Sequence, residues 1–222
     1  MKREIIVTKD GSSTISLPEL NECYHSRNGA IQEAYHVFIE RGLKLFPGNL
    51  SILEIGFGTG LNAFITLLES QASGQAIHYT AVEAYPVDPN EILQLNYIEQ
   101  LHAENYSKLY LKMHECHWEL DVALTDLFTI NKKNLRFENI DFSGNFDLIY
   151  FDAFGYDVQP ELWTEIIFHS MYNSLKPNGV LVTYAARSII KRNMESAGFV
   201  VQKLAGPPGK REMMRAIKGI PG

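Results

Sequence analysis

The stretch Leu50-Ser51-Ile52-Leu53-Glu54-Ile55-Gly56-Phe57-Gly58-Thr59-Gly60 carries the clearest structural signal in the chain. Its first six residues are mostly apolar and predict a buried strand over residues 50–55. The three alternate glycines predict a tight turn that can approach a ligand closely, because glycine has no Cβ atom. Residues 61–68 predict a helix, whose N-terminus favours negative charge. No lysine follows the last glycine, which excludes a phosphate-binding P-loop, but we expect a ligand at this turn.

Strands and helices alternate along most of the chain beyond this unit. Strands are expected over 77–82, 146–151 and 180–184, helices over 160–175 and 188–197, and a further helix after the capping box Asp88-Pro89-Asn90-Glu91. Strand-like pieces near 110–113, 128–130 and 135–137 lie in a segment that is harder to assign. The last two strands, over 199–204 and 213–217, have no helix between them and should form an antiparallel hairpin at one edge. This order predicts an α/β protein with a doubly wound, mostly parallel sheet.

Residues 1–49 precede the alternating part and predict a small extension packed on a domain of residues 50–222. Ile5-Ile6-Val7-Thr8 and Thr14-Ile15-Ser16 flank Asp10-Gly11, which is a hairpin turn signal. Residues 30–43 predict a helix with Ile31, Ala34, Tyr35 and Phe38 on one stripe.

Composition narrows the class of protein further. The chain has 222 residues, of which 45% are hydrophobic and 21% charged, so disorder and a disulfide-stapled mini-protein are excluded. Its apolar runs are too short for a membrane span, its start does not resemble a signal peptide, and its two cysteines suggest reduced thiols, so we expect a cytoplasmic protein. The net charge of −6 divides into +7 over residues 176–222 and −13 over the rest. A basic end of this kind suits a polyanion such as nucleic acid.

Two acidic residues end predicted strands, where ligands of such sheets bind. Glu83 follows the strand after the glycine turn and can accept hydrogen bonds from both hydroxyls of a ribose. Asp152 follows the strand Phe146–Phe151 and is expected at the mouth of a site. His114, Cys116 and His117 are too closely spaced for the usual zinc chelates, so no metal is expected.

The strand, the glycine turn and the acid at the end of the next strand resemble the S-adenosylmethionine site of class I methyltransferases. Further strings resemble the methyltransferase domain of the bacterial tRNA 5-methylaminomethyl-2-thiouridine biosynthesis enzyme (MnmC-like) over residues 5–217. They are Gly56-Phe57-Gly58-Thr59-Gly60-Leu61-Asn62, Val82-Glu83, Phe151-Asp152-Ala153-Phe154, Pro160-Glu161-Leu162-Trp163-Thr164, Gly209-Lys210-Arg211-Glu212-Met213, Tyr24-His25-Ser26 and His36-Val37-Phe38.

The resemblance implies a Rossmann-like fold, S-adenosylmethionine as cofactor, and N-methylation of 5-aminomethyl(-2-thio)uridine at the tRNA wobble position. It implies cofactor binding by Glu54, Gly56, Phe57, Gly58, Thr59, Gly60, Asn62, Glu83 and Asp152. It implies substrate binding by Tyr24, Ser26, Phe154, Tyr156, Lys210, Arg211 and Glu212, with Asp152 as the catalytic residue that orients the amine and accepts its proton. The partner is then a tRNA anticodon loop, whose precursor base a separate enzyme supplies.

The sequence departs from the family in two places. Ala153-Phe154-Gly155-Tyr156 replaces the Gly-Phe-Ala-Pro that often follows the family's aspartate. Neither Asp126 nor Asp141 matches the acid that many class I enzymes use to hold the adenine amino group, so that role stays open. Two alternatives remain: a class I methyltransferase or aminopropyltransferase acting on a small amine, which the acidic body would suit, and a non-catalytic partner subunit.

Overall fold

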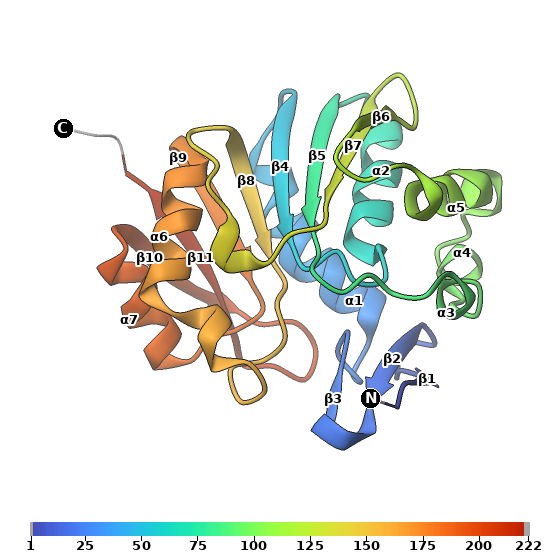
Figure 1. Ribbon diagram of the computed structural model, residues 1–222, viewed down its shortest axis with the longest axis horizontal. Helices are drawn as coiled ribbons and strands as arrows, with labels where there is room; N and C mark the ends of the chain where they lie inside the picture. Colours follow the sequence, from blue (N-terminus) through green and yellow to red (C-terminus); the bar gives the residue numbers. More distant parts are fainter. Residues whose placement is uncertain (1, 220–222) are drawn as a thin grey trace.

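The computed structural model describes residues 2–219, which form a three-stranded and an eight-stranded sheet (Figure 1). The strands are β1 (Glu4–Val7), β2 (Ser13–Leu17), β3 (Glu22–Cys23), β4 (Leu50–Ile55), β5 (Ile77–Val82), β6 (Asp121–Ala123), β7 (Phe128–Lys133), β8 (Phe146–Phe151), β9 (Leu175–Thr183), β10 (Phe199–Ala205) and β11 (Glu212–Lys218). The α-helices are α1 (Ala30–Ala34), α2 (Leu61–Ser73), α3 (Pro89–Ile92), α4 (Tyr97–Gln100), α5 (Ser107–Glu115), α6 (Glu165–Ser174) and α7 (Ser188–Ser196). A π-helical segment, η2 (Tyr35–Glu40), continues α1, and 3₁₀ turns are η1 (Pro18–Leu20), η3 (Leu43–Leu45), η4 (Glu104–Tyr106), η5 (Phe137–Asn139) and η6 (Pro160–Trp163).

The large sheet has the strand order β10-β11-β9-β8-β4-β5-β7-β6. Strands β9, β8, β4, β5 and β7 are parallel, whereas β11 runs antiparallel to both β9 and β10, and β6 runs antiparallel to β7. The expected parallel sheet and its antiparallel edge hairpin are therefore confirmed. Because β5 and β8 lie on opposite sides of β4, the winding direction reverses at β4. Ligands of such sheets bind beside this reversal, at the carboxyl ends of the strands.

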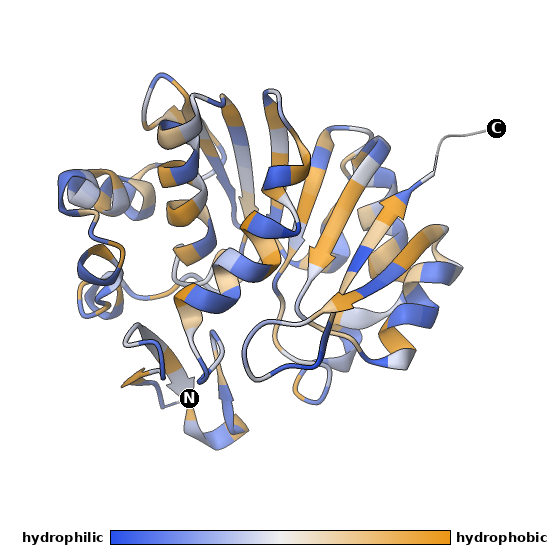
Figure 2. Cartoon of the chain, turned by 180° about the vertical axis from the view of Figure 1, so that it is seen from behind, coloured by the Kyte–Doolittle hydropathy of each residue, from blue (hydrophilic) through white to orange (hydrophobic). Residues whose placement is uncertain are grey.

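Alternate side chains of the central strands enter two hydrophobic cores. Tyr79 and Tyr150 point to the face covered by α1, η2, α2 and α5, and Ile149 and Phe151 point to the face covered by α6 and α7. Figure 2 shows hydrophobic colour along the central strands and mixed colour on the outer helices. Burial on both faces explains why these strands appear in the sequence as nearly continuous apolar runs.

The first 49 residues contribute the small sheet and the helix α1–η2. The hairpin of β1 and β2 forms as expected, with Glu4 opposite Ser16 and Val7 opposite Ser13. Figure 1 shows this sheet beyond the carboxyl ends of the parallel strands, over the glycine turn. The buried stripe of α1–η2 is displaced by one residue from the expected one: it contains Ala30, Glu33, Ala34, Val37 and Phe38. Glu33 thus points inward.

The segment that was hard to assign departs most from expectation. Residues 110–113 belong to α5, where Tyr110 and Met113 are buried one turn apart, and residues 135–137 form no strand. The capping box is confirmed, but its helix ends at Ile92. The helix expected over 160–175 is divided at Thr164, whose extended backbone separates η6 from α6.

Among residues 2–219, no helix is long and apolar enough to cross a membrane.

Candidate active site

A pocket of about 830 Å³ opens at the carboxyl ends of β4, β5 and β8. The turn after β4 and the loop after β8 form its floor. Residues 21–27 and Glu33 from the N-terminal part, and Lys210 from the tip of the β10–β11 hairpin, form its walls. The pocket is therefore assembled from distant parts of the chain, at the place where a doubly wound sheet binds its ligand.

Each of the three glycines of the turn has a backbone conformation that disfavours any other residue. Gly56, Gly58 and Gly60 have φ angles of +89°, +49° and +71°, a region that other residues rarely adopt. A Cβ atom on Gly56 would lie 2.7 Å from the carbonyl oxygen of Asp152, and one on Gly58 would lie 3.1 Å from the ring of Tyr24. The turn is thus held close to the loop after β8 and to the N-terminal wall, with Gly56 and Gly58 facing the pocket.

Glu83 follows β5 and is fixed by the backbone on both sides. Its Oε2 accepts a hydrogen bond from the N–H of Gly58 at 3.0 Å, and its Oε1 accepts one from the N–H of Tyr85 at 2.9 Å. Each carboxylate oxygen keeps a further lone pair for a ligand hydroxyl. The open glycine turn and this prepositioned acceptor fit a nucleoside whose ribose contacts Glu83.

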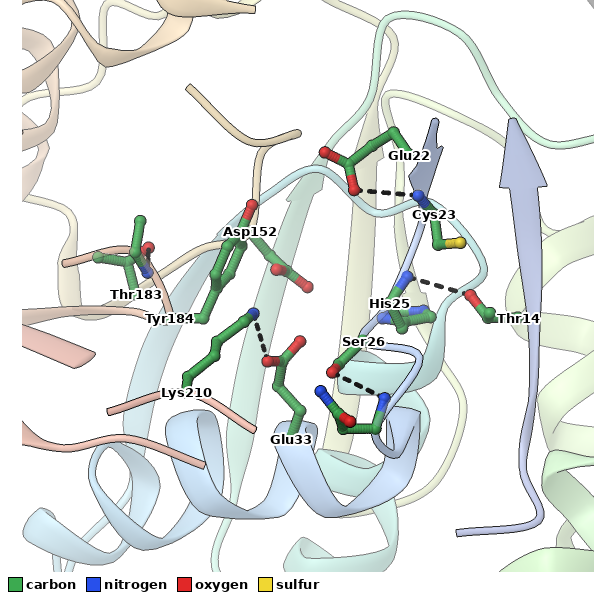
Figure 3. Close-up of polar contacts among 12 residues, drawn as sticks. Thr14, Glu22, Cys23, His25, Ser26, Glu33, Asp152, Thr183, Tyr184 and Lys210 are labelled. Carbon is green, nitrogen blue, oxygen red and sulfur yellow. Dashed lines mark hydrogen bonds and ion pairs between the residues drawn. The ribbon is translucent and has the colours of Figure 1, made fainter. Parts of the chain in front are cut away.

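Asp152 lies where β8 ends, beside the glycine turn, and its carboxylate points between Tyr184, His25 and Glu33 (Figure 3). Its Oδ2 accepts a hydrogen bond from the Nδ2 of Asn62 at 2.8 Å. Burial raises the pKa of Asp152 to about 7, and the nearby charge of Glu33 adds to this, against the opposing effects of Asn62 and Lys210. Asp152 can therefore exchange a proton near neutral pH.

Glu33 and Lys210 form an ion pair inside the pocket. The Lys210 Nζ lies 2.5 Å from Oε2 of Glu33 and 3.8 Å from the centre of the Tyr184 ring (Figure 3). The Tyr184 hydroxyl donates a hydrogen bond to the Ala153 carbonyl at 2.8 Å, which fixes the ring beside Asp152. This part of the pocket thus combines the carboxyl groups of Glu33 and Asp152 with the Lys210 ammonium and the face of the Tyr184 ring.

A second layer of polar groups lies behind the pocket surface. Glu54 is fully buried, and among residues 2–219 neither of its carboxyl oxygens has a hydrogen-bond partner. Burial raises the pKa of Glu54 well above the usual value, and the nearby charge of Asp152 adds to this. His25, which lines the pocket, connects to this layer: its Nε2 lies 2.7 Å from the Thr59 hydroxyl. Burial lowers the His25 pKa to about 4, so this imidazole is neutral at pH 7.

The structure brings together most of the residues singled out in the sequence. Those that line the pocket are Tyr24, Ser26, Gly56, Phe57, Gly58, Glu83, Asp152, Phe154 and Lys210. Glu54, Thr59, Gly60 and Asn62 lie behind this surface, where Asn62 acts on the pocket through its bond to Asp152.

Tyr156, Arg211 and Glu212, which the resemblance assigned to substrate binding, do not line this pocket. The ring of Tyr156 lies 5.6 Å from the Arg187 guanidinium, and Glu212 pairs with Lys203 at 2.7 Å. Arg211 is exposed on the hairpin beside Lys210. Glu33 and Tyr184 also line the pocket but were not singled out in the sequence.

His114, which lies near Cys116 in the sequence, packs among aromatic side chains. The His114 ring packs 5.2 Å from Phe57 and 4.9 Å from Tyr110, and burial lowers its pKa to about 4. Within the described residues, no three His, Cys, Asp or Glu side chains are grouped to hold a metal ion.

Fold and site together define a class I methyltransferase. A family model described as S-adenosyl-L-methionine-dependent methyltransferase matches residues 92–219, more than half of the chain. The protein belongs to this family, and S-adenosylmethionine is its cofactor.

Two solved structures share the fold of this chain. The crystal structure of MnmC2 from Aquifex aeolicus is similar with a TM-score of 0.80 and 22% identity, over 99% of this chain and 71% of that chain. Spermidine synthase from Thermotoga maritima is similar with a TM-score of 0.62 and 16% identity, over 99% and 69%. The resemblance noted in the sequence is thus confirmed for the family and for the MnmC2 fold.

Proposed function

We propose that the protein methylates the primary amine of 5-aminomethyl(-2-thio)uridine at the wobble position of tRNA, giving 5-methylaminomethyl(-2-thio)uridine. The observation that carries the proposal is Asp152, a carboxyl group with a pKa of about 7 at the end of β8, in a pocket beside the glycine turn. A primary amine reaches the site mostly as an ammonium and must lose a proton before it can act as a nucleophile.

The chain's own residues divide this work. The Asp152 carboxylate attracts the ammonium and accepts its proton, and Asn62 holds the carboxylate in place through its 2.8 Å hydrogen bond. The glycine turn and Glu83 hold the cofactor. When bound, S-adenosylmethionine supplies an electrophilic methyl group on a sulfonium, which takes the lone pair of the amine nitrogen and leaves S-adenosylhomocysteine. Fixing the amine and the cofactor in one pocket provides the proximity that this transfer needs.

Two features favour a tRNA base over a free amine. Tyr24 and Phe154 form an edge-to-face pair on the pocket wall, with ring centres 5.1 Å apart, and offer an aromatic surface on which an extruded base can stack. Residues 176–222 carry nine basic but only two acidic residues, and the basic ones include the exposed Arg211 beside the pocket-lining Lys210. Phosphates of an anticodon loop would meet this basic surface while the base enters the pocket.

Mass spectrometry of wobble nucleosides tests the proposal. tRNA carrying 5-aminomethyl-2-thiouridine is incubated with the protein and S-adenosylmethionine, and a mass gain of one methylene on that nucleoside is expected, with Asp152→Asn as the inactive control. No gain, although the protein binds S-adenosylhomocysteine, would exclude this function. The precursor itself requires a separate reaction that installs the aminomethyl group.

A transferase acting on a small cationic amine is the second candidate, because six carboxylates but only three cationic side chains line the pocket. The carboxylates are Glu22, Glu33, Glu83, Glu138, Asp152 and Glu161, and the cations are Arg27, Arg136 and Lys210. The similarity to spermidine synthase concerns this fold and adds nothing on substrate. If the protein transfers a group from its cofactor to putrescine but not to tRNA, it is a small-amine transferase. If it binds the cofactor but transfers nothing to either acceptor, the non-catalytic subunit is favoured.

A further inference from the structure

Lys210 occupies an unusual place for a lysine of an exposed hairpin tip. Its backbone lies in the turn between β10 and β11, where its N–H donates to the Pro207 carbonyl at 2.9 Å. Its side chain enters the pocket, where the ammonium contacts Glu33 at 2.5 Å and lies 3.8 Å from the centre of the Tyr184 ring. Glu33 is almost fully buried, at 7% exposure, so its carboxylate has little water to solvate it.

These surroundings are those that bind a primary ammonium. A carboxylate gives a charge-assisted hydrogen bond, and the face of an aromatic ring attracts a cation through its quadrupole. Asp152 stands beside the same ring, and its pKa responds to the charges of both Glu33 and Lys210. The end of the lysine side chain, a methylene that carries an ammonium, is chemically the same group as the aminomethyl substituent of the proposed acceptor.

We propose that Lys210 is a stand-in for the acceptor: its ammonium fills the subsite formed by Glu33, Tyr184 and Asp152, and the substrate ammonium displaces it. This inference rests on the proposed function, because it takes the acceptor to be a primary amine. Displacement requires only rotation of the side chain, because the hydrogen bonds that hold the hairpin tip are made by its backbone. The lysine side chain is flexible and 30% exposed, so a path to solvent is open.

Displacement has a different cost for different substrates. A tRNA brings phosphates that can pair with the ammonium once it has left Glu33, whereas a free small amine offers nothing in exchange. Lys210 therefore acts as a specificity device, which excludes free amines from an acidic pocket and admits an amine that is attached to a polyanion. Removing the ammonium should improve the binding of free amines most.

Kinetics on the free nucleoside 5-aminomethyluridine, which has no phosphate, test this inference. We expect Lys210→Met to lower the KM for this nucleoside by about tenfold or more, since the subsite is no longer filled. Lys44→Met, which removes an exposed ammonium that pairs with Glu40 and does not line the pocket, should leave it unchanged. An equal or higher KM in Lys210→Met would overturn the inference.

A binding experiment separates this inference from the proposed function. n-Propylammonium is titrated into each protein saturated with S-adenosylhomocysteine and followed by NMR. Lys210→Met should bind it at least tenfold more tightly than the unmodified protein. The double variant Glu33→Gln/Lys210→Met, which has no buried unpaired carboxylate to impair folding, should lose this gain. If Lys210→Met binds propylammonium more tightly but the protein methylates neither tRNA nor the nucleoside, the ammonium subsite is supported and methylation of the wobble uridine is refuted. If the protein methylates its substrate but Lys210→Met binds propylammonium no more tightly, only the role of Lys210 as a substitute for the acceptor is refuted.

Discussion

Replacing Asp152 by Asn should strongly reduce methyl transfer while making the protein more stable at neutral pH. Asparagine keeps the shape of the side chain and an oxygen that can accept the hydrogen bond from Asn62, but it has no charge and cannot take up a proton. We therefore expect methyl transfer under single-turnover conditions to fall about 10²-fold or more, with the affinity for S-adenosylhomocysteine largely kept.

The gain in stability follows from the pKa of Asp152. The unfolded chain has a pKa near 3.8 at this position, and folding raises it to about 7. Between these values the folded protein binds more protons than the unfolded chain, so raising the pH destabilises the fold across this window. The gap corresponds to roughly 4 kcal/mol, because each pKa unit is worth ~1.4 kcal/mol. The pocket is open to water, so we expect a gain of about 1–3 kcal/mol from Asn, absent below pH 4 and complete above pH 7.

Urea unfolding at pH 4, 5.5, 7 and 8 measures this gain. Asp147→Asn on the same strand is the matched control. The Asp147 carboxylate accepts from the Ser51 N–H at 2.7 Å and pairs with Lys176 at 2.8 Å, so its replacement should destabilise the fold. The reasoning would be refuted if Asp152→Asn had a lower free energy of unfolding than the unmodified protein at pH 8, or if the difference between the two proteins were the same at pH 4 and pH 8.

Three further predictions concern the cofactor, the turn and the basic surface. Glu83→Ala should weaken S-adenosylhomocysteine binding by about 1–3 kcal/mol, because a charged acceptor is lost; an unchanged Kd in calorimetry would contradict the assigned role. Gly56→Ala should lower the free energy of unfolding by about 1–3 kcal/mol, since its Cβ meets the Asp152 carbonyl at a φ of +89°, and an unchanged midpoint in urea would argue against this strain. Arg211→Ala should reduce the slope of log affinity for tRNA against log salt by about 0.7–0.9, one phosphate contact, with cofactor binding intact; filter binding with parallel slopes would show that Arg211 does not touch tRNA.

The central part of the fold could be predicted because its signals are local. β4, β5 and β8 begin and end at the residues expected for them, since each is an apolar run bounded by turn residues or by a charged strand end. Glu83 and Asp152 were found for the same reason: they directly follow such runs.

The errors arise where the structure depends on contacts between distant residues. Tyr110 and Met113 were expected in a strand because their short aromatic and apolar run has no neighbouring pattern, although their spacing of three fits a helix. Tyr184 could not be recognised, because only the fold places its ring against Lys210. Glu33 could not be recognised either, because the stripe expected from the sequence does not include it and only the fold shows that it is buried.

The ion pair between Glu33 and Lys210 joins residues 177 positions apart. Synthesis on the ribosome proceeds from the N-terminus, so Glu33 leaves the exit tunnel long before its partner has been added to the chain. The floor of the pocket also needs the loop after β8, which follows Glu33 by more than a hundred residues. The acceptor subsite can therefore be enclosed only after the β10–β11 hairpin has been synthesised, so an N-terminal fragment that contains the glycine turn and Glu83 does not contain the subsite.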